Sequence, residues 1–166
     1  MRGAGASAFY CGAEMATLSL QPALPIAADG PALTRVMQRA GLTRNEVIRV
    51  AGPAAVTAVL WLNRHGYDRA AFVHANRVAT MAPVDALLIP HACEARELAD
   101  LLGEADCLRE GGVLIVQTAP GGGAVGAESI PGLLATLGYQ IEHSLSERGR
   151  NVCIARRRGF GFRLAA

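Results

Sequence analysis

The hydrophobic positions of the chain follow two alternating patterns: short continuous apolar runs, and stretches in which apolar residues recur every three or four positions. The runs predict buried strands and the spaced stretches predict helices. Strands are expected at 47–50, 70–73, 85–90, 113–118, 139–145 and 151–156, and helices at 31–40, 54–62, 94–108 and 130–137. This alternation predicts a mostly parallel α/β sheet. The helix at 31–40 is expected to pack against the edge of the sheet.

Glycines and short connections add detail to this pattern. Gly41, Gly66 and Gly138 each follow an expected helix, where a left-handed residue commonly closes the last turn. Residues 110–112, Glu-Gly-Gly, are expected to form a turn that leads into strand 113–118. Residues 146–150 alone join the last two strands, which is too short for a parallel crossover, so an antiparallel hairpin is expected.

Residues 47–76 are the part of the pattern where a ligand site is expected. Strand 47–50 ends in a tight turn at Ala51-Gly52-Pro53, and Pro53 suits the first turn of a helix because its missing N–H has no partner there. Strand 70–73 ends just before His74. Ligands of such sheets bind where the carboxyl ends of strands meet helix N-termini. The sequence therefore predicts a site at residues 51–55 and 74–76.

Composition limits the classes of function. The 166 residues suggest one domain, 51% of them are hydrophobic, and no apolar run is long enough to predict a membrane span. The chain contains no lysine, which excludes a Schiff-base lysine and the lysine of a phosphate-binding P-loop. The net charge of +2 does not by itself favour a nucleic-acid partner.

The two ends of the chain and its cysteines suggest a cytoplasmic protein. Residues 1–30 are small, rich in Gly, Ala and Pro, and are expected to be a loosely ordered extension in which Met15 could be the true start. They lack the apolar run of a secretory signal. Cys11, Cys93, Cys107 and Cys153 form no C-x-x-C pair, so reduced thiols are expected. Residues 156–163 mix arginines with Phe160 and Phe162 and could stack on single-stranded nucleic acid, but a solvated tail at 159–166 is favoured.

Three stretches, in this order, resemble the class I S-adenosylmethionine-dependent methyltransferases. Residues 47–52 lie where that family has its glycine-containing first motif. Residues 108–116 are similar to its leucine–x–proline–glycine–glycine segment before a hydrophobic strand, with Glu110 in place of the proline. Residues 133–158 resemble its last helix and reversed seventh strand. The resemblance covers residues 31–158 and implies a three-layer Rossmann-like domain.

The resemblance also implies a cofactor and its contacts, and the sequence departs from the family at some of them. S-adenosylmethionine would be bound by Ala51, Gly52, Ala54, Ala55, His74 and Asn76, with the acceptor near Pro90, His91, Gln117 and Thr118. No acidic residue stands two positions before Gly52 or ends strand 70–73. Only eight residues separate Asn76 from Asp85. The sequence therefore predicts a fold that lacks one strand–helix unit.

Three further motifs leave alternatives open. His91 could act as a general base or be a partly exposed loop histidine, and the latter is favoured. With Cys93 it makes only two ligands, so no metal is expected. Gly121, Gly123 and Gly126 match G-x-G-x-x-G, with Glu142 about twenty residues further on, as in a dinucleotide-binding domain. Against that hypothesis, two residues separate the preceding strand from the glycines, and Pro131 is expected to interrupt the helix that follows.

Two functions of different classes compete. The first is a small methyltransferase that transfers a methyl group from S-adenosylmethionine to an unknown acceptor, which could be a small molecule or a protein. The second is a degenerate domain that has kept the scaffold, lost catalysis and acts as a binding or regulatory partner; a dinucleotide-binding Rossmann domain is a distant third. An edge left exposed by the missing unit would need covering, and pairing with a second copy in a homodimer is one way to cover it.

Overall fold

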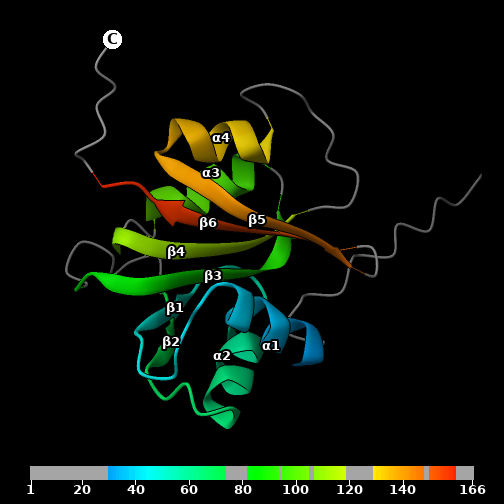
Figure 1. Ribbon diagram of the computed structural model, residues 1–166, viewed down its shortest axis with the longest axis vertical. Coiled ribbons are helices and arrows are strands. Elements are labelled where there is room, and N and C mark those ends of the chain that lie inside the picture. Colours follow the sequence, from blue (N-terminus) through cyan, green and yellow to red (C-terminus); the bar gives the residue numbers. More distant parts are fainter. Residues whose placement is uncertain are drawn as a thin grey trace, which may run out of the picture.

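The computed structural model describes residues 30–73, 82–93, 95–104, 107–118, 129–147 and 150–159. These residues form a six-stranded sheet flanked by helices (Figure 1). In chain order the elements are α1 (Gly30–Arg39), β1 (Ile48–Val50), α2 (Ala55–Arg64), β2 (Ala70–Phe72), β3 (Val84–Cys93), α3 (Ala95–Glu104), β4 (Leu108–Thr118), α4 (Ile130–Thr136), β5 (Tyr139–Glu147) and β6 (Arg150–Arg157). The alternation expected from the hydrophobic pattern is confirmed.

The sheet has the order β2-β1-β3-β4-β6-β5. Strands β2, β1, β3 and β4 pair in parallel, whereas β6 pairs antiparallel with both β4 and β5. The expected mostly parallel sheet ending in an antiparallel hairpin is therefore confirmed. Strand β2 lies at one edge, and only residues 73–83 connect it to β3. That connection is too short for a further strand with its helix, as the sequence predicted.

The described part of the chain has three layers, with the sheet in the middle. Helices α1 and α2 cover one face of the sheet, and α3 and α4 cover the other (Figure 1). The buried residues form two clusters, one on each face. Leu33, Val36 and Met37 of α1 belong to the same cluster as residues of β1, β3, β4 and β6. Helix α1 thus packs on a face of the sheet, and the expectation that it lies against the edge was wrong. The reason is that its apolar stripe is wide enough to bury four side chains.

Strands β3 and β4 are buried on both faces. Leu87 and Leu88 are adjacent on β3, and each is almost fully buried, but in different clusters. The same holds for Leu114 and Ile115 on β4. Central parallel strands covered on both sides are continuous apolar runs rather than alternating ones. The run at 113–118 therefore predicted its strand correctly.

Two strands are longer than expected because each contains a bulge. Residues 110–112 do not form a turn before β4; they lie within it, since β4 advances from 108 to 113 while β3 advances only from 84 to 86. Gly111 has φ +71°, which only glycine adopts readily, and a Cβ on Gly112 would lie 2.9 Å from the Arg109 carbonyl oxygen. Strand β3 likewise continues past Pro90 to Cys93.

The helix ends agree with the glycine pattern, with two corrections. Gly41, Gly66 and Gly138 have φ of +68°, +85° and +82° after α1, α2 and α4. Helix α3 is shorter than expected, because Cys107 and Leu108 lead into β4. Pro131 does not interrupt α4 but lies in its first turn, where Ser129 accepts a hydrogen bond from the Gly132 amide at 3.1 Å. Among the described residues, no helix combines the length and apolarity needed to cross a membrane.

Candidate functional site

The sheet order creates one place where a ligand is expected. From β1 the chain crosses outward to β2, whereas β3 and β4 follow on the other side of β1. The direction of winding therefore reverses between β1 and β3. In open α/β sheets, ligands bind in the crevice outside the carboxyl ends of the strands at such a switch point. The residues that follow β1 and those near the end of β3 are the first candidates.

The turn after β1 is held close to β3. The Ala51 amide donates to the Leu88 carbonyl oxygen at 3.0 Å, and Ala51 is buried. Gly52 has φ +91°, which L side chains rarely adopt. A Cβ there would meet Ile89 and Leu101 only at 3.8 Å, so glycine is required by the backbone conformation and not by crowding. At Gly52 the turn therefore presents backbone that no side chain covers from its own position.

Helix α2 begins directly after this turn and is open at its N-terminus. Ala54 is the N-cap residue and makes no side-chain capping hydrogen bond. The Ala55 amide donates to the Gly52 carbonyl oxygen at 3.1 Å, and Ala55 is buried. The first amides of a helix have no partner within the helix, and the helix dipole favours negative charge near them. This terminus is therefore suited to a carboxylate or another anion.

Pro90 and His91 lie within a bulge of β3, near the carboxyl end of the strand. Strand β3 advances from 89 to 93 while β4 advances from 116 to 118, so two extra residues bend β3 near its carboxyl end. Pro90 has no N–H to give to the ladder, which accounts for a break in pairing at this point. Pro90 is buried and His91 is partly exposed. The structure thus brings His91 to the same edge as Gly52, and places it within the strand rather than after it.

Gln117 and Thr118 lie at the carboxyl end of β4, one strand further from the turn. Gln117 is fully buried and Thr118 is 8% exposed. The Thr118 hydroxyl donates to the Asn151 carbonyl oxygen of β6 at 3.2 Å, so part of its hydrogen-bonding capacity is used within the sheet. These two residues share the carboxyl edge with the turn, and an acceptor role for them stays a prediction.

Several predicted site residues lie outside the described residues. These are His74 and Asn76 after β2, and the glycines of the G-x-G-x-x-G match, Gly121, Gly123 and Gly126. The expected extension at 1–30, apart from Gly30, and the expected tail at 159–166, apart from Gly159, also lie outside them. The structure therefore describes the half of the predicted site that β1, α2 and β3 build.

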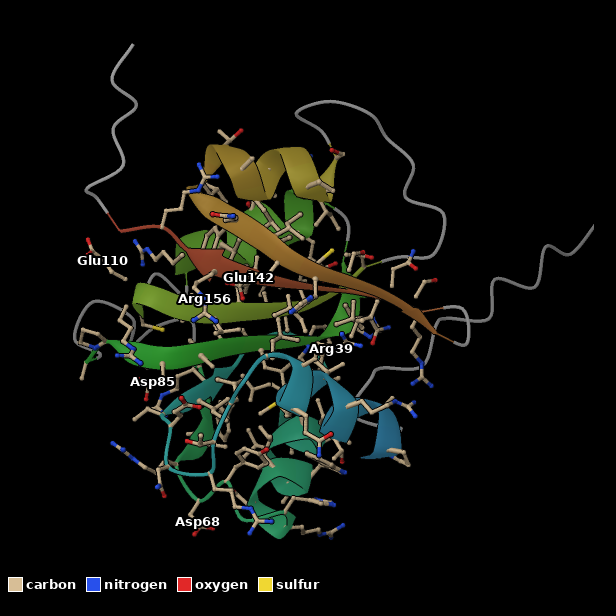
Figure 2. The ribbon with its side chains drawn as sticks, in the orientation of Figure 1. Arg39, Asp68, Asp85, Glu110, Glu142 and Arg156 are labelled. Atoms are coloured by element: carbon tan, nitrogen blue, oxygen red, sulfur yellow. The ribbon has the colours of Figure 1, made fainter. Side chains whose placement is uncertain are left out.

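Glu142, the carboxylate of the dinucleotide hypothesis, is engaged elsewhere. Its Oε1 lies 2.7 Å from Arg156 Nε, and Arg156 also donates to the Gly111 carbonyl oxygen at 2.8 Å (Figure 2). The hydrogen bond from Arg156 lowers the pKa of the Glu142 carboxyl and raises that of the guanidinium. Because Gly111 lies in the amino-terminal half of β4, this ion pair is at the far end of the sheet from the switch point. The structure gives Glu142 no place in a dinucleotide site.

Two residues near the site were not singled out from the sequence. Side-chain atoms of Leu101 on α3 and of Ile89 on β3 would each lie 3.8 Å from a Cβ at Gly52, so both residues border the turn. Leu101 lies in the expected helix at 94–108, but nothing in the sequence connects it to Gly52. That contact depends on how α3 packs across the sheet.

Asp85 is the acidic residue of β3, and it lies at the amino-terminal end of the strand, away from the switch point. It accepts a hydrogen bond from the Val47 amide at 2.7 Å and pairs with Arg109 at 2.8 Å. Both contacts join the starts of β1, β3 and β4, as the position of Asp85 in Figure 2 illustrates. Among the described residues, no three His, Cys, Asp or Glu side chains form a group that could hold a metal ion.

Comparisons with solved structures point to one fold. The sequence matches no protein-family model and no curated protein. A ribosomal protein L11 methylase from Lactobacillus delbrueckii subsp. bulgaricus is similar in structure, with TM-score 0.55, 12% identity, and coverage of 78% of this chain and 79% of that one. An S-adenosylmethionine-dependent O-methyltransferase from Thermotoga maritima has TM-score 0.54 and 10% identity, over 76% of this chain and 64% of that one.

A third similar structure contains a ligand. It is an N-methyltransferase from Haemonchus contortus in complex with S-adenosylhomocysteine, with TM-score 0.53, 12% identity, and coverage of 84% of this chain and 39% of that one. The fold of this chain is that of the class I methyltransferases, in a form with six strands among the described residues. At sequence identities this low, structural similarity shows the fold alone, and function has to be argued from the site.

Proposed function

We propose that this protein binds S-adenosylmethionine at the switch point and transfers its methyl group to an acceptor. The observation that carries the proposal is the turn at Gly52, which brings backbone atoms and the open N-terminus of α2 to the edge where β1 and β3 end. A fold shared with methyltransferases, one of which is complexed with S-adenosylhomocysteine, supports the choice of ligand.

The residues present fit one end of this cofactor. The amino-acid part of S-adenosylmethionine has a carboxylate, which suits helix N-terminal amides. Small residues at Ala51, Ala54 and Ala55 would let this carboxylate approach the backbone of the turn. The ribose would lie toward the carboxyl end of β2, where Asn76 is proposed to hydrogen-bond a hydroxyl, more weakly than the charged acceptor that the family uses.

Chemistry at the site requires little from the protein. When bound, the cofactor supplies an electrophilic methyl group on a positively charged sulfur, whose bonding electron pair stays on the sulfur as the methyl leaves. The chain has to align a nucleophile and exclude water. His91 is proposed to accept the proton that the acceptor loses, because an imidazole can take up a proton near neutral pH. Pro90, buried beside it, limits the backbone freedom of this bulge.

A second candidate function is favoured by a specific feature of the site. The position two residues before Gly52 is Val50, which is fully buried in the core, and no carboxylate occurs in residues 50–55. A domain that kept this scaffold and lost the acidic contacts would act as a binding or regulatory partner without turnover. The two candidates differ in whether the switch point still binds the cofactor.

The test is isothermal titration of the whole chain with S-adenosylmethionine and S-adenosylhomocysteine, with NAD as the control ligand. Micromolar binding of either adenosyl compound, without binding of NAD, is the expected result. No heat with either compound would remove the enzyme hypothesis and leave the regulatory one. An acceptor screen follows only if binding is seen.

A matched pair of variants locates the cofactor. Ala54→Asp would place a carboxylate at the N-terminus of α2, where it would repel the carboxylate of the ligand and occupy the open amides. Affinity is expected to fall by about tenfold or more, which corresponds to roughly 1.4 kcal/mol. Ala54→Asn has the same shape without the charge and should lose less affinity. Equal affinities for the two variants would place the ligand elsewhere.

The role of His91 is tested separately once an acceptor is known. His91→Ala should lower turnover by roughly 10²-fold, as expected for loss of a general base, and leave cofactor affinity unchanged. Unchanged turnover would remove His91 from the mechanism.

A further inference from the structure

The carboxyl-terminal end of α2 gathers three arginines from separate parts of the chain, and the site at the switch point uses none of them. Arg64 is the last residue of α2, Arg44 belongs to the loop after α1, and Arg69 precedes β2; all three are exposed. A Cβ on Gly66 would lie 3.3 Å from Arg44 Cδ, so Arg44 lies over the turn that ends α2. Arg69 Nη1 donates to the Asn45 carbonyl oxygen at 2.9 Å, which holds Arg69 beside the same loop.

Neighbouring carboxylates do not neutralise these arginines. Among the described residues, no carboxylate forms an ion pair with any of the three. Asp68 is the one exposed carboxylate of the turn between α2 and β2, where Figure 2 labels it. Glu46 accepts a hydrogen bond from the Thr43 amide at 2.6 Å. The net charge of +2, averaged over the whole chain, therefore does not reveal this local excess of positive charge.

A stacked ring lies beside the arginines. His65, which follows Arg64 in the chain, stacks on Trp61 with the ring centroids 3.8 Å apart and the ring planes at 17°. His65 Nδ1 donates to the Trp61 carbonyl oxygen at 2.8 Å, and this hydrogen bond fixes the orientation of the imidazole. Trp61 itself packs against the buried cluster under α1 and α2. Because the indole covers one face of the imidazole and His65 is exposed, the other face is open to a further ring.

The end of the helix explains only part of this arrangement. Positive side chains near a helix C-terminus interact favourably with the helix dipole, which accounts for Arg64. The dipole does not account for Arg44 and Arg69, which come from other segments, or for a ring held flat on an indole. Gathered guanidinium groups repel one another, and they bind phosphate oxygens strongly because their planar fork matches the geometry of phosphate. Flat side chains next to such cations stack on nucleobases.

We propose that this end of α2 binds a single-stranded nucleic acid, with the three arginines on its phosphates and an unpaired base stacked on His65. A single strand is required because the bases of a duplex are already stacked on both faces. RNA and DNA share this chemistry, and the test distinguishes them. An acidic peptide or an anionic membrane would satisfy the arginines without using the open face of the imidazole.

The surface is separate from the site proposed for S-adenosylmethionine. Helix α2 has ten residues, so its two ends are about 15 Å apart, and the switch point lies at the other end. The nucleic-acid surface therefore does not depend on whether the protein binds the cofactor, and it is tested with the cofactor absent.

The test is fluorescence anisotropy of the whole chain with labelled oligonucleotides of about ten nucleotides. Oligo(U) and oligo(dU) differ only in the 2′-hydroxyl, and a DNA duplex of the same length is the comparison. The expected result is binding of a single strand and weaker binding of the duplex. The logarithm of the affinity should fall with the logarithm of salt concentration with a slope of about −2, as three phosphate contacts require. Tighter binding of oligo(U) assigns RNA, and tighter binding of oligo(dU) assigns DNA.

Variants separate the stacked base from the phosphates. His65→Ala should lower the affinity for the single strand about fivefold or more, whereas His65→Phe keeps a flat ring and should retain it. Arg44→Gln with Arg64→Gln should make the salt slope less steep by about 1.4. Asp68→Asn removes the nearby negative charge and should strengthen binding. Arg96→Gln, at an exposed arginine of α3 on the other face of the sheet, is the matched control and should change nothing.

Several outcomes would overturn the proposal. One is that neither single strand binds, or that the duplex binds as tightly as they do. Another is that binding is unchanged in the His65→Ala and double arginine variants, which would place the nucleic acid elsewhere on the chain. Titrations with a polyglutamate peptide and with phosphatidylserine vesicles complete the test. If either of these binds in place of the single strands and is lost in the double arginine variant, the partner is an acidic protein or a membrane and the proposal is wrong.

Discussion

At the scale of single residues, Gly112 shows how tightly the bulge of β4 is built. A Cβ at this position would lie 2.8 Å from Leu108 Cδ1 and 2.9 Å from the Arg109 carbonyl oxygen. The side chain could move, but the backbone oxygen is part of the same strand. The alignment of β4 with β3 therefore depends on having no side chain here.

Gly112→Ala is expected to lower the free energy of unfolding by about 1–3 kcal/mol, because the added methyl group must displace backbone. Gly103→Ala is the matched control: its Cβ would meet nothing within 4 Å, and alanine in a helix is favoured over glycine. That variant should be neutral or more stable by up to about 1 kcal/mol. Urea denaturation measures both, and equal effects would show that the bulge tolerates a side chain.

The ion pair between Glu142 and Arg156 predicts a pH dependence of stability. Arg156 lowers the pKa of Glu142 below its ordinary value of 4.5. A carboxyl with a lowered pKa in the folded state adds stability above its unfolded pKa, and this contribution is lost as the pH falls through the folded pKa. Because both side chains are partly exposed, the contribution is expected to be less than about 1 kcal/mol.

Glu142→Gln should therefore be slightly less stable than the natural chain at pH 7. The difference should shrink as the pH falls below 4.5 and disappear once Glu142 is protonated in both states. Thermal denaturation from pH 7 to pH 3 follows this difference. A gap between the two proteins that widens in acid would contradict the prediction.

At the scale of elements, β3 is the strand on which both faces of the domain depend. Leu87 packs in the cluster with α3 and α4, and Leu88 in the cluster with α1 and α2. Each is at most 1% exposed. The strand also carries Pro90 and His91, the two residues of the candidate site that follow Leu88 by two and three positions along β3.

Leu87→Ala and Leu88→Ala are each expected to lower the free energy of unfolding by about 2–5 kcal/mol, from lost burial and the cavity left behind. Leu137→Ala, at a position 44% exposed, should cost less than about 1 kcal/mol. Chemical denaturation of the three variants gives the comparison. A small cost at only one of the two strand positions would mean that one face of the sheet is loosely packed.

At the scale of the whole molecule, one sheet lies between the two apolar clusters, and its central strands contribute residues to both. The single tryptophan, Trp61, packs against the cluster with α1 and α2, whereas Leu98 of α3 is buried in the other cluster. Since both clusters draw on β3, β4 and β6, neither is expected to unfold while the other stays intact.

Leu98→Ala should therefore lower the urea midpoint reported by Trp61 fluorescence by the same amount as the midpoint reported by far-UV circular dichroism. The corresponding loss of stability is about 2–5 kcal/mol. Leu33→Ala, in the cluster nearer Trp61, is the control for a local effect on fluorescence. Two separate transitions in the Leu98 variant would show that the layers unfold independently.

Much of the domain was predictable because its signals are local. Apolar runs marked the buried strands, since a strand covered on both faces needs apolar residues at consecutive positions. Gly41, Gly66 and Gly138 marked helix ends, since a left-handed residue there favours glycine whatever the surroundings. The short link at 73–83 revealed the missing strand–helix unit, because chain length alone limits what can be built.

Other features depended on contacts between distant segments. Residues 110–112 form a bulge and not a turn because β4 must stay in register with β3, and register is set between strands. Glu142 belongs to an ion pair because the antiparallel β5–β6 hairpin brings it beside Arg156. The sequence by itself therefore determined the order of the elements and the Gly52 turn. Only the tertiary structure decided which segments meet at the switch point, because strand pairing and helix packing bring residues far apart in the chain together.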